Sequence, residues 1–349
     1  MSPGSASPLE PGRASRTFPL VKAAVCTRYG PPEVVRITDV DKPVAAENEL
    51  LVKVDATTVN RTDCGYRAAK PFILRFFTGL ARPKPERRVL GTEFAGEVEA
   101  IGSSVTSFEV SDKVFGYVEG PFGAHAEYLT TREDASVATV PANATVEEAA
   151  ASTEGSHYAL ANIRAAKISS GQHVLVNGGT GAIGSAAVQL LKSLGAHVTA
   201  VCSTEHVALV ERLGADRVID YLAADFTKDD QTYDVVFDAA GKSSFGRCKR
   251  LLKPKGIYLS TELGPFPQNP ILALITPLFR GKRVLFAIPR HDQEMVNHIK
   301  GLIESEAFEP VIDRRYPLNE IVDAYRYAET GQKIGNVVIS VADRVDQLL

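Results

Sequence analysis

The sequence is poor in cysteine, and its few cysteines are scattered. Cys26, Cys64, Cys202 and Cys248 form no C-x-x-C pair and no other short spacing. That pattern indicates neither a disulfide framework nor a thiolate zinc site, and it is typical of a reducing compartment. We therefore expect a cytoplasmic protein.

The chain also lacks a strong excess of charge and a long apolar run. Its formal net charge is −3, which gives no reason to expect a nucleic-acid partner. No segment reaches the roughly 18 uninterrupted apolar residues of a membrane-spanning helix. The chain has 349 residues, and single cores stop growing near about 250–300 residues, so we expect two domains.

The first 18 residues have too few apolar side chains to form a core. They are rich in Ser, Pro, Gly and Ala, so residues 1–18 are interpreted as a disordered tail. The missing apolar stretch excludes a secretory signal, whereas an organellar transit peptide stays open as an alternative.

Three further regions differ in their hydrophobic pattern. Residues 19–145 hold short runs rich in β-branched residues between turn signals, which predicts an antiparallel, barrel-like domain. Residues 146–306 begin with a helical pattern and then alternate strand and helix, which predicts a parallel sheet covered on both faces. Residues 307–349 look like a return to the first domain.

A glycine-dense turn between two apolar runs is the most informative stretch. Residues 173–177 and 198–202 are predicted strands, and a helical pattern occupies residues 186–194 between them. The turn has the G-x-G-x-x-G spacing of a dinucleotide-binding unit, in which glycines permit a sharp turn, a close approach to the pyrophosphate and tight helix packing. A plain tight turn is the alternative. The expected cofactor-binding residues here are Gly179, Thr180, Gly181, Ala182, Ile183 and Gly184.

Four stretches occur together in one order along the chain: NRTD at 60–63, GTEFAGEV at 91–98, the turn at 177–184 and GNVV at 335–338. In this the chain resembles the medium-chain dehydrogenase/reductase superfamily, most closely its zinc-free, quinone-oxidoreductase-like branch. The resemblance covers residues 21–341. It implies an α/β fold with a GroES-like β-barrel-type substrate domain, a Rossmann doubly wound parallel sheet and an active site in the cleft between them.

The resemblance also bears on metal binding. Zinc alcohol dehydrogenases of this superfamily carry a ligand cysteine at the position of Asn60 and a ligand histidine at that of Thr92, and neither an amide nor a hydroxyl can replace these ligands. We therefore expect no metal. Without a Lewis acid, a quinone or enone is a better acceptor than a simple ketone, because hydrogen-bond donors can stabilise the enolate oxygen that forms.

Two groups of polar residues are candidates for the reaction centre. Asn60 and Tyr66 are the expected donors to the acceptor oxygen, although Tyr66 has the alternative of packing in the cleft wall. In the superfamily the segment at 153–158 passes beside the nicotinamide, which makes Thr153, His157 and Tyr158 candidates for cofactor contacts or a proton relay. A structural role is the alternative for His157.

The residues after the second predicted strand bear on the choice of cofactor. No carboxylate stands there to favour NAD, and the small side chains of Ser203 and Thr204 leave room for a 2′-phosphate. This favours NADPH. NADH stays possible, because Glu205 stands where similar NADPH-dependent sequences have Lys or Arg. Two further cofactor-binding residues are expected, Tyr221 and Asn336.

Residues 70–88 interleave apolar and basic side chains, and they are interpreted either as a lid over the acceptor or as a surface helix. The apolar run at 284–288 predicts an edge strand and, since this strand often pairs with its two-fold mate in the superfamily, a homodimer. The sequence thus predicts a zinc-independent NAD(P)H-dependent oxidoreductase that acts on a small-molecule quinone, enone or related carbonyl. A metal-free alcohol or aldehyde dehydrogenase and a non-catalytic dinucleotide-gated binding protein are the alternatives.

Overall fold

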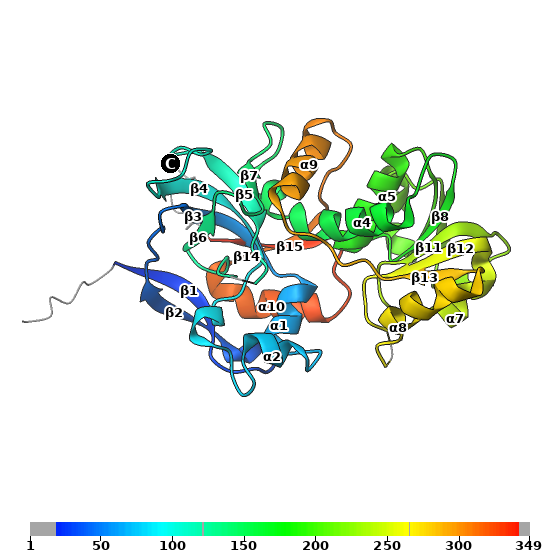
Figure 1. The fold of residues 1–349 in the computed structure, drawn as a ribbon, viewed down its shortest axis with the longest axis horizontal. Coiled ribbons are helices and arrows are strands. Elements are labelled where there is room, and N and C mark those ends of the chain that lie inside the picture. The colour runs from blue at the N-terminus through cyan, green and yellow to red at the C-terminus, as the bar shows by residue number, and fades with distance from the viewer. Residues whose placement is uncertain (1–18, 121, 265, 342–349) are drawn as a thin grey trace, which may run out of the picture.

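The computed structural model describes residues 19–120, 122–264 and 266–341, so the expected tail at 1–18 lies outside the described residues. Two sheet-based bodies lie side by side along the long axis of the molecule (Figure 1). No helix in the described ranges is long and apolar enough to cross a membrane.

The first body is built on a seven-stranded sheet. It combines strands from residues 49–139 with two strands from residues 312–340. All of its strand pairs are antiparallel except β14–β15, so the sheet is mixed rather than wholly antiparallel as expected. Its strand order is β14 (Ile312–Pro317), β15 (Asn336–Ser340), β3 (Glu49–Thr58), β4 (Glu93–Ile101), β5 (Lys113–Tyr117) and β7 (Val137–Thr139), with β6 (Tyr128–Arg132) paired to β3. A separate hairpin consists of β1 (Leu20–Cys26) and β2 (Val35–Asp41).

The second body is a six-stranded parallel sheet. Its order is β10 (Arg217–Asp220), β9 (His197–Cys202), β8 (His173–Asn177), β11 (Tyr233–Asp238), β12 (Leu252–Ser260) and β13 (Arg283–Leu285). Counted from β8, this is the 3-2-1-4-5-6 order of a doubly wound dinucleotide fold, and it reverses direction between β8 and β11. The predicted α/β fold with a Rossmann doubly wound parallel sheet is therefore confirmed.

Side chains of successive strand residues are buried on both faces of the parallel sheet. Leu175 and Val236 belong to one apolar core, whereas their chain neighbours Val176 and Phe237 belong to the core on the opposite face. Because helices cover both faces, the strands are continuous apolar runs rather than alternating ones. The predicted strands at 173–177 and 198–202 accordingly lie within one residue of the bounds of β8 and β9.

Helices connect the strands and cover the sheets. The helical pattern at the start of residues 146–306 forms two helices: the one at 146–150 packs on the first sheet, and the one at 153–166 packs on the helix at 182–193 beside the second sheet. The helices are α1 (Arg61–Ala68), α2 (Leu74–Thr78), α3 (Val146–Ala150), α4 (Thr153–Ala166), α5 (Ala182–Ser193), α6 (Val207–Arg212), α7 (Phe245–Cys248), α8 (Gln268–Ile275), α9 (Gln293–Glu304) and α10 (Ile321–Glu329).

The strand expected at 284–288 is shorter in the structure. Among the described residues β13 pairs with β12 alone, so it lies at the edge of the sheet, and it ends at Leu285. Ile288 is 81% exposed, and Pro289 after it has no N–H to donate to a ladder. The chain therefore leaves the sheet three residues earlier than the apolar run suggests.

Candidate active site

A cavity of about 1000 Å³ lies between the two bodies. The parallel strands direct their carboxyl ends toward it, as is usual for ligand sites in doubly wound sheets. Residues at or just beyond the ends of five strands line it: Asn177, Cys202, Tyr221, Ala239 and Thr261. The opposite wall comes from α1, from the start of α2 and from residues 328–333.

The glycine-rich turn forms one wall of this cavity. Its backbone is tied to β9, because the N–H groups of Gly178 and Gly179 both donate to the carbonyl oxygen of Val201, at 3.2 and 3.0 Å. A Cβ atom at Gly184 would lie 1.9 Å from the carbonyl oxygen of Gly178, so this position admits only glycine. A Cβ atom at Gly181 would meet nothing nearer than 3.8 Å. Gly184 therefore serves the packing of α5, whereas Gly181 faces open space.

The predicted cofactor-binding residues of the turn divide into two groups. Thr180, Gly181, Ala182 and Ile183 line the cavity, and Gly181 is the N-cap of α5. The N–H groups in the first turn of a helix have no partner within the helix, so the end of α5 offers donors to an anion. Gly179 and Gly184 lie behind this surface and support it.

The turn is closed from the other side by the loop before β15. The N–H of Gly335 donates to the carbonyl oxygen of Thr180 at 2.7 Å. Asn336, an expected cofactor-binding residue, is 5% exposed and donates to the carbonyl oxygen of Val311. It does not line the cavity, so the structure gives it a role in holding this loop rather than in direct contact with a ligand.

Of the cofactor-binding residues expected near β9 and β10, one lines the cavity and two do not. Tyr221 is 56% exposed and lines the wall. Ser203 is buried, and the Thr204 hydroxyl donates to the Asp220 carboxylate at 2.5 Å, so neither belongs to the lining. The Glu205 side chain is 76% exposed and lies 3.4 Å from the Nε2 atom of His206.

Tyr66 lines the opposite end of the cavity and is held by a carboxylate. Its hydroxyl donates to Glu119 at 3.0 Å, and the other oxygen of Glu119 lies 3.0 Å from the Nε2 atom of His291. Burial, and then the charge of Glu119, raises the pKa of Tyr66 above its usual range. Burial alone would raise the pKa of Glu119, but its hydrogen bond and attraction to His291 outweigh this and lower it. Tyr66 is therefore held as a neutral hydroxyl at the cavity wall.

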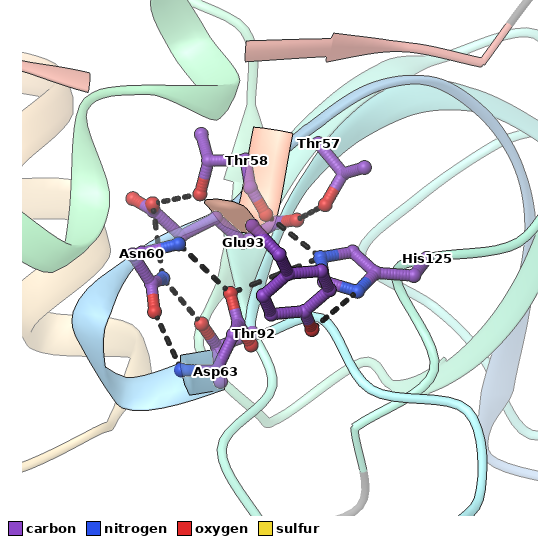
Figure 2. Close-up of polar contacts among 8 residues, drawn as sticks. Thr57, Thr58, Asn60, Asp63, Thr92, Glu93 and His125 are labelled. Atoms are coloured by element: carbon purple, nitrogen blue, oxygen red, sulfur yellow. Dashed lines mark hydrogen bonds and ion pairs between the residues drawn. The ribbon is translucent and has the colours of Figure 1, made fainter. Parts of the chain in front are cut away.

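Asn60 lies inside the first body, as Figure 2 shows. Its side-chain oxygen accepts from the N–H of Asp63 at 2.9 Å and so caps α1. Its amide nitrogen donates to the Thr92 hydroxyl at 2.8 Å and to the Glu93 carboxylate at 3.4 Å. Because the amide is 2% exposed and engaged at both ends, the structure corrects its expected role as a donor to the acceptor.

Thr153 and His157 are also placed away from the cavity surface. Thr153 is fully buried and donates its hydroxyl to Glu93 at 2.8 Å. His157 packs against Tyr117 and His291, and burial lowers its pKa to about 3. It is thus neutral near physiological pH, and the expected proton relay through it is corrected to a structural role in the wall. Tyr158, the third candidate of this segment, does line the cavity.

Several cavity residues were not singled out from the sequence. Thr62 and Glu154 lie within stretches that the sequence marked as important, yet neither was given a role. Glu119 and His291 are far apart in the chain and have no sequence signal that would pair them. The cavity is also lined by Lys70, from the stretch interpreted as a lid or a surface helix, and by three cations that were not assigned: Arg61, Lys242 and Lys333.

Comparison with known proteins identifies the family. A family model described as "Alcohol dehydrogenase GroES-like domain" matches residues 46–142, and one described as "Zinc-binding dehydrogenase" matches residues 213–339. A 2-methylene-furan-3-one reductase of Solanum lycopersicum is 32% identical over 333 residues, which cover 91% of this chain and 79% of the relative. The chain belongs to the medium-chain dehydrogenase/reductase superfamily.

Two further similarities place the chain in the quinone-oxidoreductase-like branch of this superfamily. An NADPH-dependent alkenal/one oxidoreductase of Arabidopsis thaliana is 30% identical, with coverage of 91% of this chain and 79% of the relative. The solved structure of a quinone oxidoreductase from Coxiella burnetii has a TM-score of 0.83 at 26% identity, and the match covers 93% of this chain and all of that one.

The zinc that many members of this superfamily hold does not fit the residues found here. Asn60 and Thr92 stand at two of the ligand positions and hydrogen-bond to each other. In the described ranges no group of three or more His, Cys, Asp or Glu side chains could hold a metal ion. An amide and a hydroxyl are not zinc ligands of structural or catalytic sites, so no step of the chemistry is assigned to a metal.

Proposed function

We propose that this protein is a zinc-independent, NADPH-preferring oxidoreductase that transfers hydride to a quinone, an enone or a related activated carbonyl. The observation that carries the proposal is one cavity with two different walls. The glycine-rich turn and the N-terminus of α5 form one wall, and the Tyr66 hydroxyl lies on the other. The names of the relatives, which include an enone reductase, an alkenal/one oxidoreductase and a quinone oxidoreductase, support this class of acceptor.

The turn fits the pyrophosphate of a dinucleotide. Gly181 leaves open the space that a Cβ would enter, and the adjacent N–H groups at the start of α5 attract anions. Residues 180–183 would hold the pyrophosphate, and Tyr221 would lie against the adenosine. When bound, the dinucleotide supplies the hydride.

The choice of NADPH rests on the residues at the end of β9. No carboxylate ends this strand, where NAD-specific folds place one for the ribose hydroxyls. The nearby carboxylate of Asp220 is already engaged, because it accepts from the Thr204 hydroxyl and from the N–H of Leu222. Asp220 is therefore engaged within the protein, whereas the exposed Glu205 just beyond β9 is the carboxylate that opposes a preference for NADPH.

The Tyr66 hydroxyl would stabilise the negative charge that develops on the acceptor oxygen. Burial and Glu119 hold it neutral, and its one proton would turn from the Glu119 carboxylate to the acceptor oxygen. Removing one donor of this kind typically lowers kcat by about 10²–10³-fold. An acceptor whose charge spreads over an enolate or a hydroquinone anion needs only such donors, whereas a simple ketone usually depends on a Lewis acid.

The test is NADPH consumption with a panel of quinones, enals, enones, enoyl thioesters and simple ketones. We expect turnover with the activated acceptors, and a kcat/KM about 100-fold lower in Tyr66→Phe. Tyr128→Phe is the matched control, since Tyr128 contacts Lys42 away from the cavity. Activity confined to simple ketones would contradict the proposal. Cofactor binding without any turnover would favour a non-catalytic binding protein instead.

We also propose a homodimer and a cytoplasmic location, each from a single observation. β13 ends the parallel sheet with one side unpaired in the described chain, and exposed edges of this kind are usually covered or paired. This supports a two-fold homodimer. The four cysteines are free, which is compatible with the expected reducing, cytoplasmic compartment.

A further inference from the structure

Glu154 presents a carboxyl group to the cavity from the first turn of α4. It is 5% exposed and lines the cavity together with Thr62, Tyr158 and Lys333. Thr62 lies near both Glu154 and Tyr158 and lowers the pKa of each. A buried carboxyl that still reaches a ligand-sized cavity is an uncommon arrangement, because burial of a charge is costly unless the group has a use or a partner.

Gly155 holds this carboxyl close to the dinucleotide turn. A Cβ atom at position 155 would lie 2.6 Å from the carbonyl oxygen of Ala182, so only glycine lets α4 approach the start of α5 this closely. Ala182 itself lines the cavity. Glu154 and the glycine-rich turn therefore belong to the same continuous wall, and Tyr66 lies in the lining of the same cavity.

The neighbour Glu93 is already a fully engaged carboxylate. It accepts five hydrogen bonds, from the hydroxyls of Thr58 and Thr153, the amide of Asn60 and the backbone N–H groups of Thr153 and Glu154. All of its partners are donors, which suits the ionised form of a carboxylate. A second negative charge on Glu154 beside it would be unfavourable.

Charged and titratable groups face Glu154 from every neighbouring element. They are Asp63 and Cys64 of α1, Glu93 of β4, Tyr117 and Glu119 at the end of β5, Tyr158 of α4 itself and Lys333 of the loop before β15. Burial, followed by repulsion from Glu93, raises the pKa of Glu154 to about 8, although Thr62 and Lys333 oppose this. Burial lowers the pKa of Lys333. Near neutral pH, Glu154 thus retains its proton.

We propose that Glu154 is the acid that protonates the α-carbon of the acceptor after hydride addition, which makes enones the substrate class that requires it. This inference rests on the proposed function. Hydride addition at the β-carbon leaves an enolate. The O–H bond of Glu154 then breaks, a C–H bond forms at the α-carbon, and the electron pair of the O–H bond stays on the carboxylate. A water proton restores the acid, so the enone gains one hydride and one proton.

Asp63 cannot be the acid that protonates the α-carbon, although burial also raises its pKa well above the usual range. Its side chain is 0% exposed and lies outside the cavity lining. Thr62 lines the cavity beside Glu154 and Tyr158. Reduction of a quinone serves as the comparison for reduction of an enone. Hydroquinone oxygens take their protons readily from water, so quinone reduction needs no acid that protonates a carbon.

The first experiment detects the carboxyl proton of Glu154 by infrared spectroscopy of the protein without ligands. Infrared difference spectra between pH 7 and pH 10 should show a protonated carboxyl that is lost as the pH rises through about 8. This band should be absent from Glu154→Gln, while thermal denaturation shows that the variant is folded. Glu211→Gln, at an exposed carboxyl of α6, is the control and should keep the band. A wild-type spectrum unchanged in Glu154→Gln would overturn the proposal.

The second experiment compares two acceptors. Loss of a general acid typically lowers a rate by about 10²–10⁴-fold, so kcat for an enone should fall about 100-fold or more in Glu154→Gln. The kcat for a quinone should fall much less, so the ratio of enone kcat to quinone kcat is the readout. Wild-type kcat for the enone should fall as the pH rises through about 8, and the variant should lack this fall. An unchanged enone kcat, or a wild-type enzyme that reduces quinones but no enone, would overturn this inference alone, whereas inactivity of the wild type with both acceptors would overturn the proposed function as well.

Discussion

Replacing Gly181 by alanine separates cofactor binding from folding. Gly181 has φ −70° and ψ 167°, which any residue adopts, and a Cβ there would meet nothing nearer than 3.8 Å. Gly→Ala at such a position stabilises by about 0.4–1 kcal/mol through the unfolded state. Alanine is a poorer N-cap than glycine by roughly 0.5–1 kcal/mol. The two effects nearly cancel, so the melting temperature should change by no more than about 2 °C.

The same methyl group should weaken dinucleotide binding. It would enter the cavity at the position where the backbone is expected to approach the pyrophosphate. Loss of about 1.4 kcal/mol or more corresponds to a Kd for NADPH at least tenfold higher. Calorimetric titration of the purified protein with NADPH measures this, alongside thermal denaturation. Gly181→Val should show a larger loss, because its branched side chain fills more of the same space.

Gly184→Ala is the matched comparison. Its Cβ would lie 1.9 Å from a backbone oxygen of Gly178, and overpacking of this kind typically costs about 1–3 kcal/mol or more. Its melting temperature should therefore fall by roughly 5 °C or more. If Gly181→Ala is folded and binds NADPH as the wild type does, the turn is not the pyrophosphate site and the reasoning fails.

Two further predictions concern composition and assembly. Metal analysis of the purified protein should find no stoichiometric zinc, and chelators should leave its activity unchanged, because Asn60 and Thr92 offer no thiolate or imidazole; one zinc per chain would contradict this. Light scattering at micromolar concentration should give the mass of a dimer, because β13 leaves a sheet edge to be paired. A monomer there would refute the homodimer.

The strand and the glycine-rich turn after it could be predicted from the sequence because their signals are local. The bounds of β8 agree with the predicted strand at 173–177, since a short apolar run that ends at glycines permits few other structures. The helix after it begins at Ala182 rather than at 186. Its first turn consists of Ala, Ile, Gly and Ser, which carry little hydrophobic periodicity although the backbone is already helical.

The residues expected to act on the acceptor could not be predicted in the same way, because their contacts are with residues far away in the sequence. Asn60 was expected to donate to the acceptor oxygen. Instead the amide satisfies buried neighbours, Thr92 and Glu93, and caps α1. A polar group left in the interior must find such partners, and the sequence does not show which ones are within reach. The sequence likewise gives no sign that Glu119 pairs with His291.

Exchange of Glu205 for lysine tests where the 2′-phosphate lies. The Glu205 side chain is 76% exposed and lies 3.4 Å from His206, just beyond the end of β9. Exposed charges at such a site interact by about 1 kcal/mol each, so Glu205→Lys replaces a repulsion by an attraction. The preference for NADPH over NADH should rise about tenfold or more, and the gain should shrink with added salt. The Kd for NADH should barely change, because NADH has no phosphate there. Equal shifts for both dinucleotides, or none, would show that Glu205 points away from the phosphate.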